Sequence, residues 1–489
     1  MPASLMPGYI DYLRFLPEIL LSLFGIAVMM LEADGRLKKS YLSLFALTGV
    51  VLAFLGNLLS YSQPGFAFQH MLEVDEYGVF FRAVILAVGF LCMLASFSYL
   101  EREGAEGGEY YALILFSLVG QCIMATAADL IMVFIGLEIS SIATYILAGY
   151  LRDDRRNNES ALKYFLLGSF ATAFLLYGVA WVYGIIGSTN LDQIKNALGA
   201  QAFSGQGSST LITLAAGLIF VGLAFKVSVA PFQIWAPDVY QGASAPVSAF
   251  LSAGPKAAAF AIFFRLFMTS FRPMNNRWIW LTWGCALATM FIGNLGALLQ
   301  TNVKRMLGYS SIAHAGYVLV ALTACSGMGV AAAMFYLASY ALMNIGAFAV
   351  ISYVAGRNEQ HVKIEDLAGL GRREPVVAAL LSIFVFSLIG IPLTGGFFGK
   401  FYVFQAALNS HLVWLTVLGL INSAIASYYY LKVIVAIYMH EPGEAVTQLA
   451  PPSLSLRVAI WGSALGVLFL GIFPGALLSV ASYSAAAFR

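Results

Sequence analysis

Charged residues are scarce in this sequence. Only 10% of its 489 residues are Asp, Glu, Lys or Arg, whereas an ordinary soluble domain has about 25%. Hydrophobic residues make up 60% and recur in long runs from end to end, which excludes a soluble enzyme and predicts one polytopic membrane domain. The net charge of +2 is too evenly balanced to suggest a nucleic-acid partner.

Patterns typical of cofactor sites are also absent. The cysteines Cys92, Cys122, Cys285 and Cys325 lie far apart in apolar runs, as small buried hydrophobes do. Among the histidines, only His314 lies deep within an apolar run. The sequence has no H-E-x-x-H motif, no P-loop and no dinucleotide fingerprint. We therefore expect the chain itself to hold no metal, nucleotide or redox cofactor.

What is present is a series of apolar runs, which predicts about fourteen transmembrane helices of roughly 20 residues each. The expected fold class is therefore an all-α polytopic membrane protein. The predicted spans are 12–31, 41–60, 78–100, 110–128, 130–151, 161–187, 209–233, 244–270, 278–300, 304–325, 329–355, 376–408, 411–439 and 456–485. The first span is predicted to be a retained helix, because it lacks the basic region and cleavage site of a signal peptide.

Basic residues collect on one side of the membrane when these spans alternate in direction. The rich side holds Arg36, Lys38, Lys39, Arg102, Arg152, Arg155, Arg156, Lys304, Arg305, Arg357, Lys363, Arg372, Arg373 and Arg457; the poor side holds Lys195, Arg272, Arg277 and Arg489, with Arg14 and Arg82 near helix starts. The positive-inside rule makes the rich side cytoplasmic. We therefore expect a multi-pass protein of a bacterial-type inner membrane with both termini outside.

A faint internal repeat runs through the sequence. Ser140-Ser-Ile-Ala143 recurs as Ser310-Ser-Ile-Ala313, and other short matches follow in the same order. Because an odd number of helices separates the copies, the second unit is predicted to be inverted relative to the first, as in many transporters. The predicted parts are three N-terminal helices in 1–109, a five-helix unit in 110–274, an inverted five-helix unit in 275–440 and a C-terminal helix in 441–489.

Two spans contain helix breakers near their middles. One has Pro231 shortly after Lys226, and the other has Gly390-Ile-Pro-Leu-Thr-Gly-Gly396. A broken helix leaves backbone groups that lipid cannot satisfy, so each break must face protein or a water-filled cavity. A packing kink explains one isolated proline, but two matched breaks, each near a lysine, favour an ion path.

Five ionisable residues lie deep in otherwise apolar spans: Glu138, Lys226, Lys256, Lys400 and Lys432. Inserting each of them costs about 2.5–3.5 kcal/mol, which favours a functional role for the first four. Lys432 is as well explained by snorkelling of its side chain to the interface. Desolvation lowers the pKa of a lysine and a nearby carboxylate raises it, so a buried lysine beside a mobile carboxylate can bind and release a proton.

Other ionisable residues complete this interpretation. His314 is a candidate proton relay, although a hydrogen-bonded structural histidine is the alternative. Lys163 is a weaker relay candidate. Asp129 and Arg265, near span ends, are predicted to be structural, and Asp238 to cap or link helices in a loop.

Four motifs resemble the antiporter-like membrane subunits of respiratory complex I. They are Phe225-Lys226-Val-Ser-Val-Ala-Pro231, Gly254-Pro-Lys256, Gly308-Tyr-Ser-Ser-Ile and Gly390-Ile-Pro-Leu-Thr-Gly-Gly-Phe-Phe-Gly-Lys400. The four motifs occur in the order typical of that family, and the likeness extends over essentially the whole chain. Within that family, Lys400 favours the subunit N branch, because the M branch usually has a glutamate there. One departure is Gln233, where relatives often have histidine.

The resemblance implies a subunit of a proton-pumping translocase that transfers electrons from NADH to quinone. It implies that NADH, FMN, iron–sulfur clusters and quinone are bound by partner subunits, and that other membrane-arm subunits, antiporter-like ones among them, are the partners. By resemblance, Glu138 and Lys226 form a coupling pair, Lys256 and His314 a central relay, and Lys400 the link to the outer side.

Two rival functions remain open on the sequence. A subunit of a multi-subunit cation/proton antiporter shares this fold and these lysines. A structural scaffold of a membrane arm is the other rival, and it predicts that the intramembrane lysines tolerate neutral replacement. Copurifying subunits separate the first rival from complex I.

Overall fold

The computed structural model describes residues 7–35, 38–200 and 206–488, and nearly all of them are helical. The first part of the chain forms α1 (Tyr9–Arg14), α2 (Leu16–Asp34), α3 (Lys39–Ser60), β1 (Gly65–Ala67), β2 (Leu72–Val74) and α4 (Glu76–Glu103). The next part forms α5 (Gly108–Thr126), α6 (Leu130–Ala148), α7 (Arg155–Ile186), α8 (Leu191–Gly199), α9 (Gln206–Lys226), α10 (Trp235–Gly242) and α11 (Ala245–Arg265).

The second half of the chain continues in the same way. It forms α12 (Asn275–Leu298), α13 (Val303–Thr323), α14 (Gly327–Val354), α15 (Leu370–Arg373), α16 (Pro375–Ile389), α17 (Gly395–Asn409), α18 (Val413–Met439), α19 (Glu444–Thr447), α20 (Leu454–Ile472) and α21 (Pro474–Ser484). The short helical segments are η2 (Leu266–Ser270), η3 (Arg272–Met274), η4 (Arg357–Glu359), η5 (Ile364–Leu367) and η6 (Ala485–Phe488).

The helix count agrees with the sequence. Among the described residues, twelve helices are long and apolar enough to cross a membrane, and two shorter apolar helices, Thr210–Lys226 and Pro375–Ile389, end at breaks. Together they match the expected fourteen spans. The predicted boundary at Ala128-Asp129 is also confirmed, since α5 ends at Thr126 and α6 begins at Leu130.

Both predicted helix breaks are present. An irregular segment separates α9 from α10, and another separates α16 from α17. In the second break, Gly390 adopts a left-handed φ of 93°, which glycine accepts without steric cost. Gly396 must also be glycine, because a Cβ there would lie 1.9 Å from the carbonyl oxygen of Ser387.

Two local features differ from the prediction. The last span is two helices, because α20 ends at Ile472 and α21 begins at Pro474, whose ring lacks the N–H that a continuing helix needs. The expected all-helical fold also contains a two-stranded antiparallel sheet, β1–β2. Three residues of its turn, Phe68, Gln69 and His70, have positive φ. A tight turn of this kind leaves no signal in the pattern of apolar runs, so the sequence did not predict the sheet.

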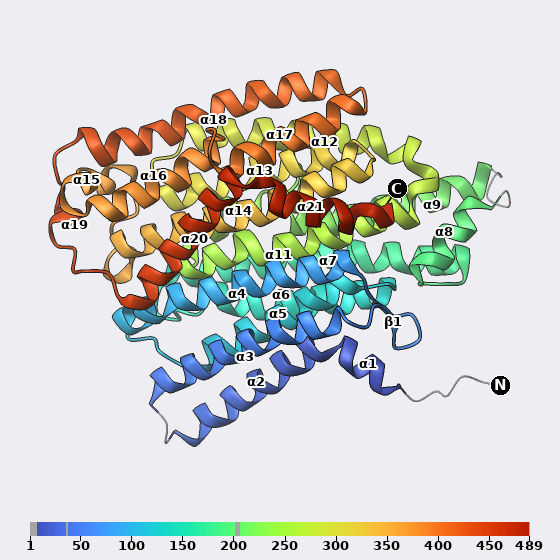
Figure 1. Ribbon diagram of the computed structural model, residues 1–489, viewed down its shortest axis with the longest axis horizontal. Helices are drawn as coiled ribbons and strands as arrows, with labels where there is room; N and C mark the ends of the chain where they lie inside the picture. The colour runs from blue at the N-terminus through green and yellow to red at the C-terminus, as the bar shows by residue number, and fades with distance from the viewer. Residues whose placement is uncertain (1–6, 36–37, 201–205, 489) are drawn as a thin grey trace.

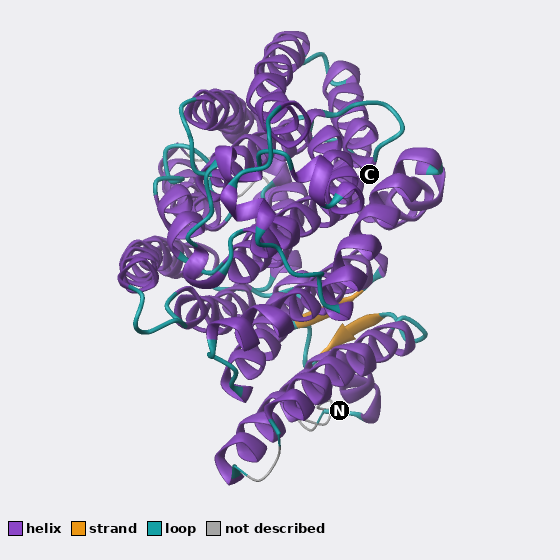
Figure 2. Cartoon of the chain, turned by 90° about the vertical axis from the view of Figure 1, so that its left-hand side faces the viewer, coloured by secondary structure: helices purple, strands orange, loops and turns teal. Residues whose placement is uncertain are grey.

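The helices form one elongated bundle (Figure 1), with α2 and α3 at one edge and α18 at the opposite edge. Figure 2, turned by 90°, shows many of the helices nearly end-on and the two strands beside the N-terminal helices. Helix α11 packs against α4, α5 and α14, and its most apolar stretch is entirely buried. Helices α13 and α14 are almost as enclosed. These three helices carry the centre of the candidate site.

Helix α15, which carries Arg372 and Arg373 of the predicted basic side, lies at one end of the bundle, and α1 and the end of α21 lie toward the other end (Figure 1). The assignment of Lys304 to a loop of the basic side is wrong: it lies in the first turn of α13 and is only 1% exposed. Arg36 and Arg489 lie outside the described residues.

Candidate functional site

Lys226 lies where the first broken helix ends. It is the last residue of α9, is 4% exposed, and donates to the hydroxyls of Ser141 at 2.8 Å and Tyr164 at 3.2 Å. The Tyr164 ring stacks on Trp235, the first residue of α10, with ring centroids 4.5 Å apart. The break thus places an ammonium group against hydroxyls from α6 and α7.

Glu138 lies one turn before Ser141 on α6, on the same helix face. It accepts a hydrogen bond from Thr172 of α7 at 2.8 Å. Within the described part of the chain no ion pair joins Glu138 to Lys226, so the direct pair that the resemblance implied is not formed. The reason is local: Thr172 holds the carboxylate, while Ser141 and Tyr164 hold the ammonium.

Lys256 lies midway along the enclosed helix α11 and is 2% exposed. Its ammonium donates to the carbonyl of Ser311 at 2.9 Å and also to the Ser311 hydroxyl. No carboxylate pairs with it among the described residues. A buried charge without a counter-ion is expensive, and here two oxygens of one serine offset part of that cost.

His314 lies one turn after Ser311 on α13. One ring nitrogen, Nδ1, is 2.6 Å from the Tyr336 hydroxyl, and the other, Nε2, is 3.3 Å from the Tyr430 hydroxyl. The Tyr430 hydroxyl also hydrogen-bonds to Ser310. Both nitrogens therefore have exchangeable partners, an arrangement that suits a relay and a structural histidine alike.

Lys400 is held by the second broken helix. It lies in the second turn of α17, is 6% exposed, and donates to the carbonyls of Leu388 at 2.9 Å and Ile389 at 2.8 Å. These carbonyls close α16, and the C-terminal end of a helix attracts positive charge. Ser423 accepts a third hydrogen bond at 2.9 Å, and the ammonium lies 5.0 Å from the centre of the Tyr317 ring.

One face of α13 connects these groups. Ser311 contacts Lys256, His314 follows one turn later, and Tyr317 another turn later beneath Lys400. Side chains at a spacing of three share a helix face. The structure therefore brings Lys256, His314 and Lys400 together along a single polar stripe, although they come from three different helices.

The two weaker candidates lie apart from this stripe. Lys163 is 42% exposed on its side chain and forms ion pairs with Glu159 at 2.6 Å and Asp238 at 2.9 Å. Asp238 also pairs with Arg305 at 2.6 Å, so it links helices as predicted, although it lies within α10 and not in a loop. These residues line a polar cavity of about 190 Å³. Lys432 is exposed, as expected for a lysine that snorkels.

Two charged residues near helix ends, Asp129 and Arg265, are structural. Asp129 caps α6 by accepting from the Ile131 amide at 2.8 Å, and Arg265 pairs with Glu73 at 2.6 Å and Asp75 at 2.7 Å. Both roles were predicted. A buried pair that the sequence did not reveal joins Arg82 of α4 to Glu18 of α2 at 2.6 Å, with both side chains fully buried. Its only signal was a carboxylate inside the first apolar run.

Several buried polar atoms near this stripe have no protein partner among the described residues. They are Ser228 Oγ, Gln233 Oε1, Tyr240 OH, Ser339 Oγ and Asn344 Oδ1. Buried polar groups in proteins are nearly always hydrogen-bonded, and internal water serves where protein does not. Ser228 and Gln233 lie in the break between α9 and α10, and Ser339 and Asn344 lie in α14.

Comparison with known proteins gives one consistent family. Residues 127–426 match the family described as NADH:quinone oxidoreductase/Mrp antiporter, TM. Over 490 aligned residues the chain is 58% identical to NADH-quinone oxidoreductase subunit N 1 of Solibacter usitatus strain Ellin6076, and the alignment covers 99% of each chain.

Solved structures show the same similarity. A chain of respiratory complex I from Thermus thermophilus with bound aureothin matches with a TM-score of 0.80 and 34% identity, covering 95% of this chain and 99% of that one. A chain of the Mrp complex from Dietzia sp. DQ12-45-1b matches with a TM-score of 0.83, covering 98% and 97%. Its identity is 21%, so this second likeness concerns the fold alone.

Proposed function

Because this chain belongs to the NADH-quinone oxidoreductase subunit N family, we propose that it is the membrane subunit through which protons cross while the complex transfers electrons from NADH to quinone. It is then part of a proton-pumping translocase. The redox chemistry belongs to partner subunits, which hold the NADH site, FMN, the iron–sulfur clusters and the quinone site. This chain contributes the proton path.

The observation that carries the proposal is the setting of Lys256. An ammonium group 2% exposed, without a carboxylate partner among the described residues, lies at the centre of the bundle. A scaffold gains nothing from a charge that costs about 2.5–3.5 kcal/mol to insert. A proton carrier needs a group whose charged and neutral forms are close in free energy, and burial without a counter-ion provides that.

The proposed path runs from Lys226 to Lys256, then along α13 through His314 to Lys400. Among the described residues no chain of side-chain hydrogen bonds links Lys226 to Lys256, so we infer that water completes that step. Between Lys256 and Lys400, the hydroxyls of Ser311 and Tyr317 and the imidazole of His314 lie in sequence.

Glu138 is the proposed control element. Its carboxylate accepts a hydrogen bond from Thr172. On α6, Glu138 lies one turn before Ser141, the serine that accepts from Lys226. Movement of the carboxylate toward the ammonium would favour the charged lysine, and its return to Thr172 would favour release of the proton. A conformational or electrostatic change in a neighbouring subunit is the proposed trigger of that movement.

The wider assembly follows from this role. We propose that other membrane-arm subunits, including antiporter-like ones, flank this chain in the lipid bilayer of a bacterial inner membrane. No feature of the sequence suggests nucleic acid as a partner. Both termini are proposed to face outward, and the five-helix units 110–274 and 275–440 each provide half of the path. A cation/proton antiporter subunit is disfavoured because the high-identity relative is subunit N.

The coupling step is tested by replacing each of its two residues, Glu138 and Lys226. In complex reconstituted into proteoliposomes, Glu138→Gln and Lys226→Met should each lower proton transfer through this subunit about 100-fold, as for loss of a general acid or base. Electron transfer should continue when an uncoupler is present. Proton uptake is read with a pH-sensitive dye at a measured NADH oxidation rate. A fully pumping, assembled double variant would refute the mechanism.

Lys163 should matter much less than these residues. We expect Lys163→Gln to change proton pumping by less than about twofold and stability by about 1 kcal/mol at most, because Lys163 is 42% exposed and Arg305 still balances Asp238. The proton-to-electron ratio and the melting temperature of the purified complex measure both effects. A loss as large as that of Lys226→Met would instead make Lys163 part of the path.

A further inference from the structure

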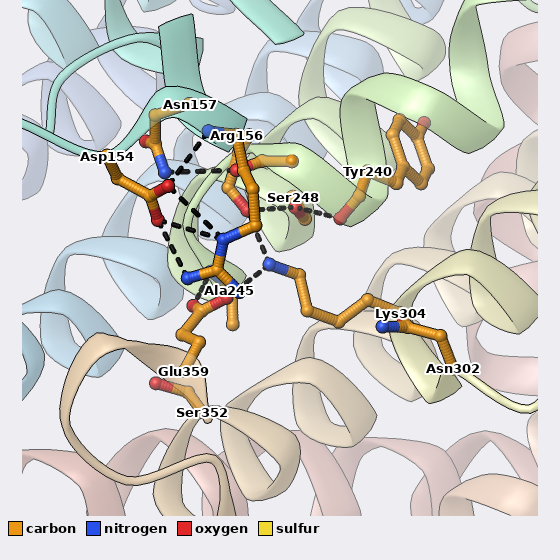
Figure 3. Close-up of polar contacts among 12 residues, drawn as sticks. Asp154, Arg156, Asn157, Tyr240, Ala245, Ser248, Asn302, Lys304, Ser352 and Glu359 are labelled. Carbon is orange, nitrogen blue, oxygen red and sulfur yellow. Dashed lines mark hydrogen bonds and ion pairs between the residues drawn. The ribbon is translucent and has the colours of Figure 1, made fainter. Parts of the chain in front are cut away.

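A buried ion pair lies about three helical turns from the central relay, at the end of the bundle where α11 and α13 begin. Glu359 and Lys304 are 8% and 1% exposed and point toward each other (Figure 3). The carboxylate of Glu359 also accepts from the Tyr99 hydroxyl at 3.0 Å and from the backbone amide of Ala245 at 2.6 Å. One carboxylate thus serves three donors from three different helices.

Two of these donors, Ala245 and Lys304, lie in the first turn of a helix. Ala245 is the first residue of α11, and the preceding Ser244 makes no side-chain cap, so Glu359 supplies the cap that this helix otherwise lacks. Lys304 lies in the first turn of α13, where the helix dipole disfavours a positive charge. The Glu359 carboxylate, which also caps α11, compensates for that unfavourable position.

The loop that carries Glu359 is held in a strained form. Asn358 and Glu359 have φ values of 58° and 48°, a left-handed conformation that is costly for a residue such as glutamate. The Asn358 carbonyl accepts from Arg156 of α7 at 2.8 Å, and its amide donates to Glu103 of α4 at 2.9 Å. The surrounding helices thus hold the loop in the conformation that buries the carboxylate.

Arg156 is itself fixed at the start of α7. It forms an ion pair with Asp154 at 2.8 Å. Partial burial by itself raises the pKa of Asp154, but hydrogen bonds from the side chain and backbone of Arg156 outweigh that effect, so the pKa lies below its ordinary value. Asp154 therefore remains ionised at neutral pH and keeps Arg156 in place over the loop.

The two helices joined by Glu359 are those that create the central contact of the relay. From Ala245 to Lys256 is roughly 16 Å along α11, and from Lys304 to Ser311 roughly 10 Å along α13, at 1.5 Å per residue. Close-packed protein interiors are hardly compressible and transmit strain. A change of register at these helix starts therefore alters the distance from Lys256 to Ser311.

We propose that Glu359 is a positioning residue for proton transfer: by capping α11 and pairing with Lys304 of α13, it sets the register that brings Lys256 to Ser311. This inference rests on the proposed function. Glu359 touches no group of the relay, so it acts only through the two helices. It belongs to η4, between α14 and α15, and it ties α13 of the second unit to α11, the last helix of the first.

The test uses the whole complex in proteoliposomes. Glu359→Gln retains an acceptor for Ala245 and Tyr99 but leaves Lys304 unpaired, and we expect proton transfer through this subunit to fall at least about threefold, since small misplacements are costly. Lys304→Arg keeps the pair and should retain most pumping. Hydrogen exchange should rise together at the first turns of α11 and α13 in Glu359→Gln alone.

The matched control removes the same charge from an exposed pair. Glu441 pairs with Arg372, and their side chains are 79% and 55% exposed, so Glu441→Gln should pump normally. If Glu359→Gln does not assemble, the double variant Glu359→Gln with Lys304→Met, which leaves no unpaired charge, is assayed in its place. Normal proton-to-electron ratios in the assembled single or double variant would overturn the inference.

A Lys256→Met variant assayed in parallel distinguishes failure of this inference from failure of the proposed function. If Lys256→Met stops proton transfer while the Glu359 variants pump normally, the positioning role alone fails. If Lys256→Met also pumps normally, the proposed function fails. Lowered stability with an unchanged proton-to-electron ratio would show a purely structural pair and would likewise overturn the positioning role.

Discussion

Replacing Lys256 by methionine should lower proton transfer through this subunit at least about 100-fold, with electron transfer preserved in the presence of an uncoupler. Methionine has nearly the length of the lysine stem and fits an apolar site, so the variant removes the titrating amine with little change in packing. The two oxygens of Ser311 lose their donor and can bind water instead.

An arginine at the same position distinguishes charge from proton exchange. A guanidinium keeps its proton under all physiological conditions, so Lys256→Arg should retain a buried positive charge yet transfer no protons. If the role of Lys256 were electrostatic, the arginine variant would pump and the methionine variant would not. Pumping by both variants would contradict any essential role for this residue.

Lys432→Met is the matched control for Lys256→Met. Both changes remove one lysine charge from an apolar helix, but Lys432 is exposed whereas Lys256 is buried. We expect the proton-to-electron ratio of the Lys432 variant to equal that of the unmodified complex. A large loss of pumping here would favour the relay interpretation of Lys432 over snorkelling.

The parts of the site that depend on local chemistry could be predicted from the sequence. Proline and clustered glycines disfavour a continuous helix through local geometry alone, so the breaks after Lys226 and before Lys400 were visible without a structure. Likewise, a lysine midway along a long apolar run lies at membrane depth. For the same reason α11 was expected to carry Lys256 deep in the membrane, as the structure shows.

The parts that depend on contacts between distant segments could not be predicted. Lys304 follows a polar break and looks like a loop charge, and only the folding of the loop around Glu359 buries it. The partner of Glu138 is decided by which rotamer reaches Thr172 of α7. Sequence spacing gives the helix face of a residue but not the neighbouring helix that it meets.

The two copies of the predicted inverted repeat share one chemical feature, although the repeat itself stays a prediction. The second serine of each repeated motif accepts a hydrogen bond from a buried lysine, Ser141 from Lys226 and Ser311 from Lys256. A hydroxyl can both accept and donate, so it can pass a proton as well as hold the ammonium. The repeated serine is therefore a second kind of position, beside the breaks, at which both units present the same chemistry.

Lys400→Met should produce the other large loss, because Lys400 is the last buried amine of the proposed path. Its ammonium is held by the carbonyls of Leu388 and Ile389 and by Ser423, all acceptors, so without the lysine no amine remains at this break in the described part of the chain. We expect proton transfer through the subunit to fall about 100-fold. Uncoupled NADH oxidation should change little, and both rates are measured in proteoliposomes.

A milder variant at the same place tests the geometry. Ser423→Ala removes one of three acceptors and leaves the two helix-end carbonyls, so pumping should fall by less than about tenfold, corresponding to about 1.4 kcal/mol. If Lys400 conducts protons, loss should be graded from Ser423→Ala to Lys400→Met. Full pumping by assembled Lys400→Met would place the exit elsewhere, because no second buried amine lies at this break among the described residues.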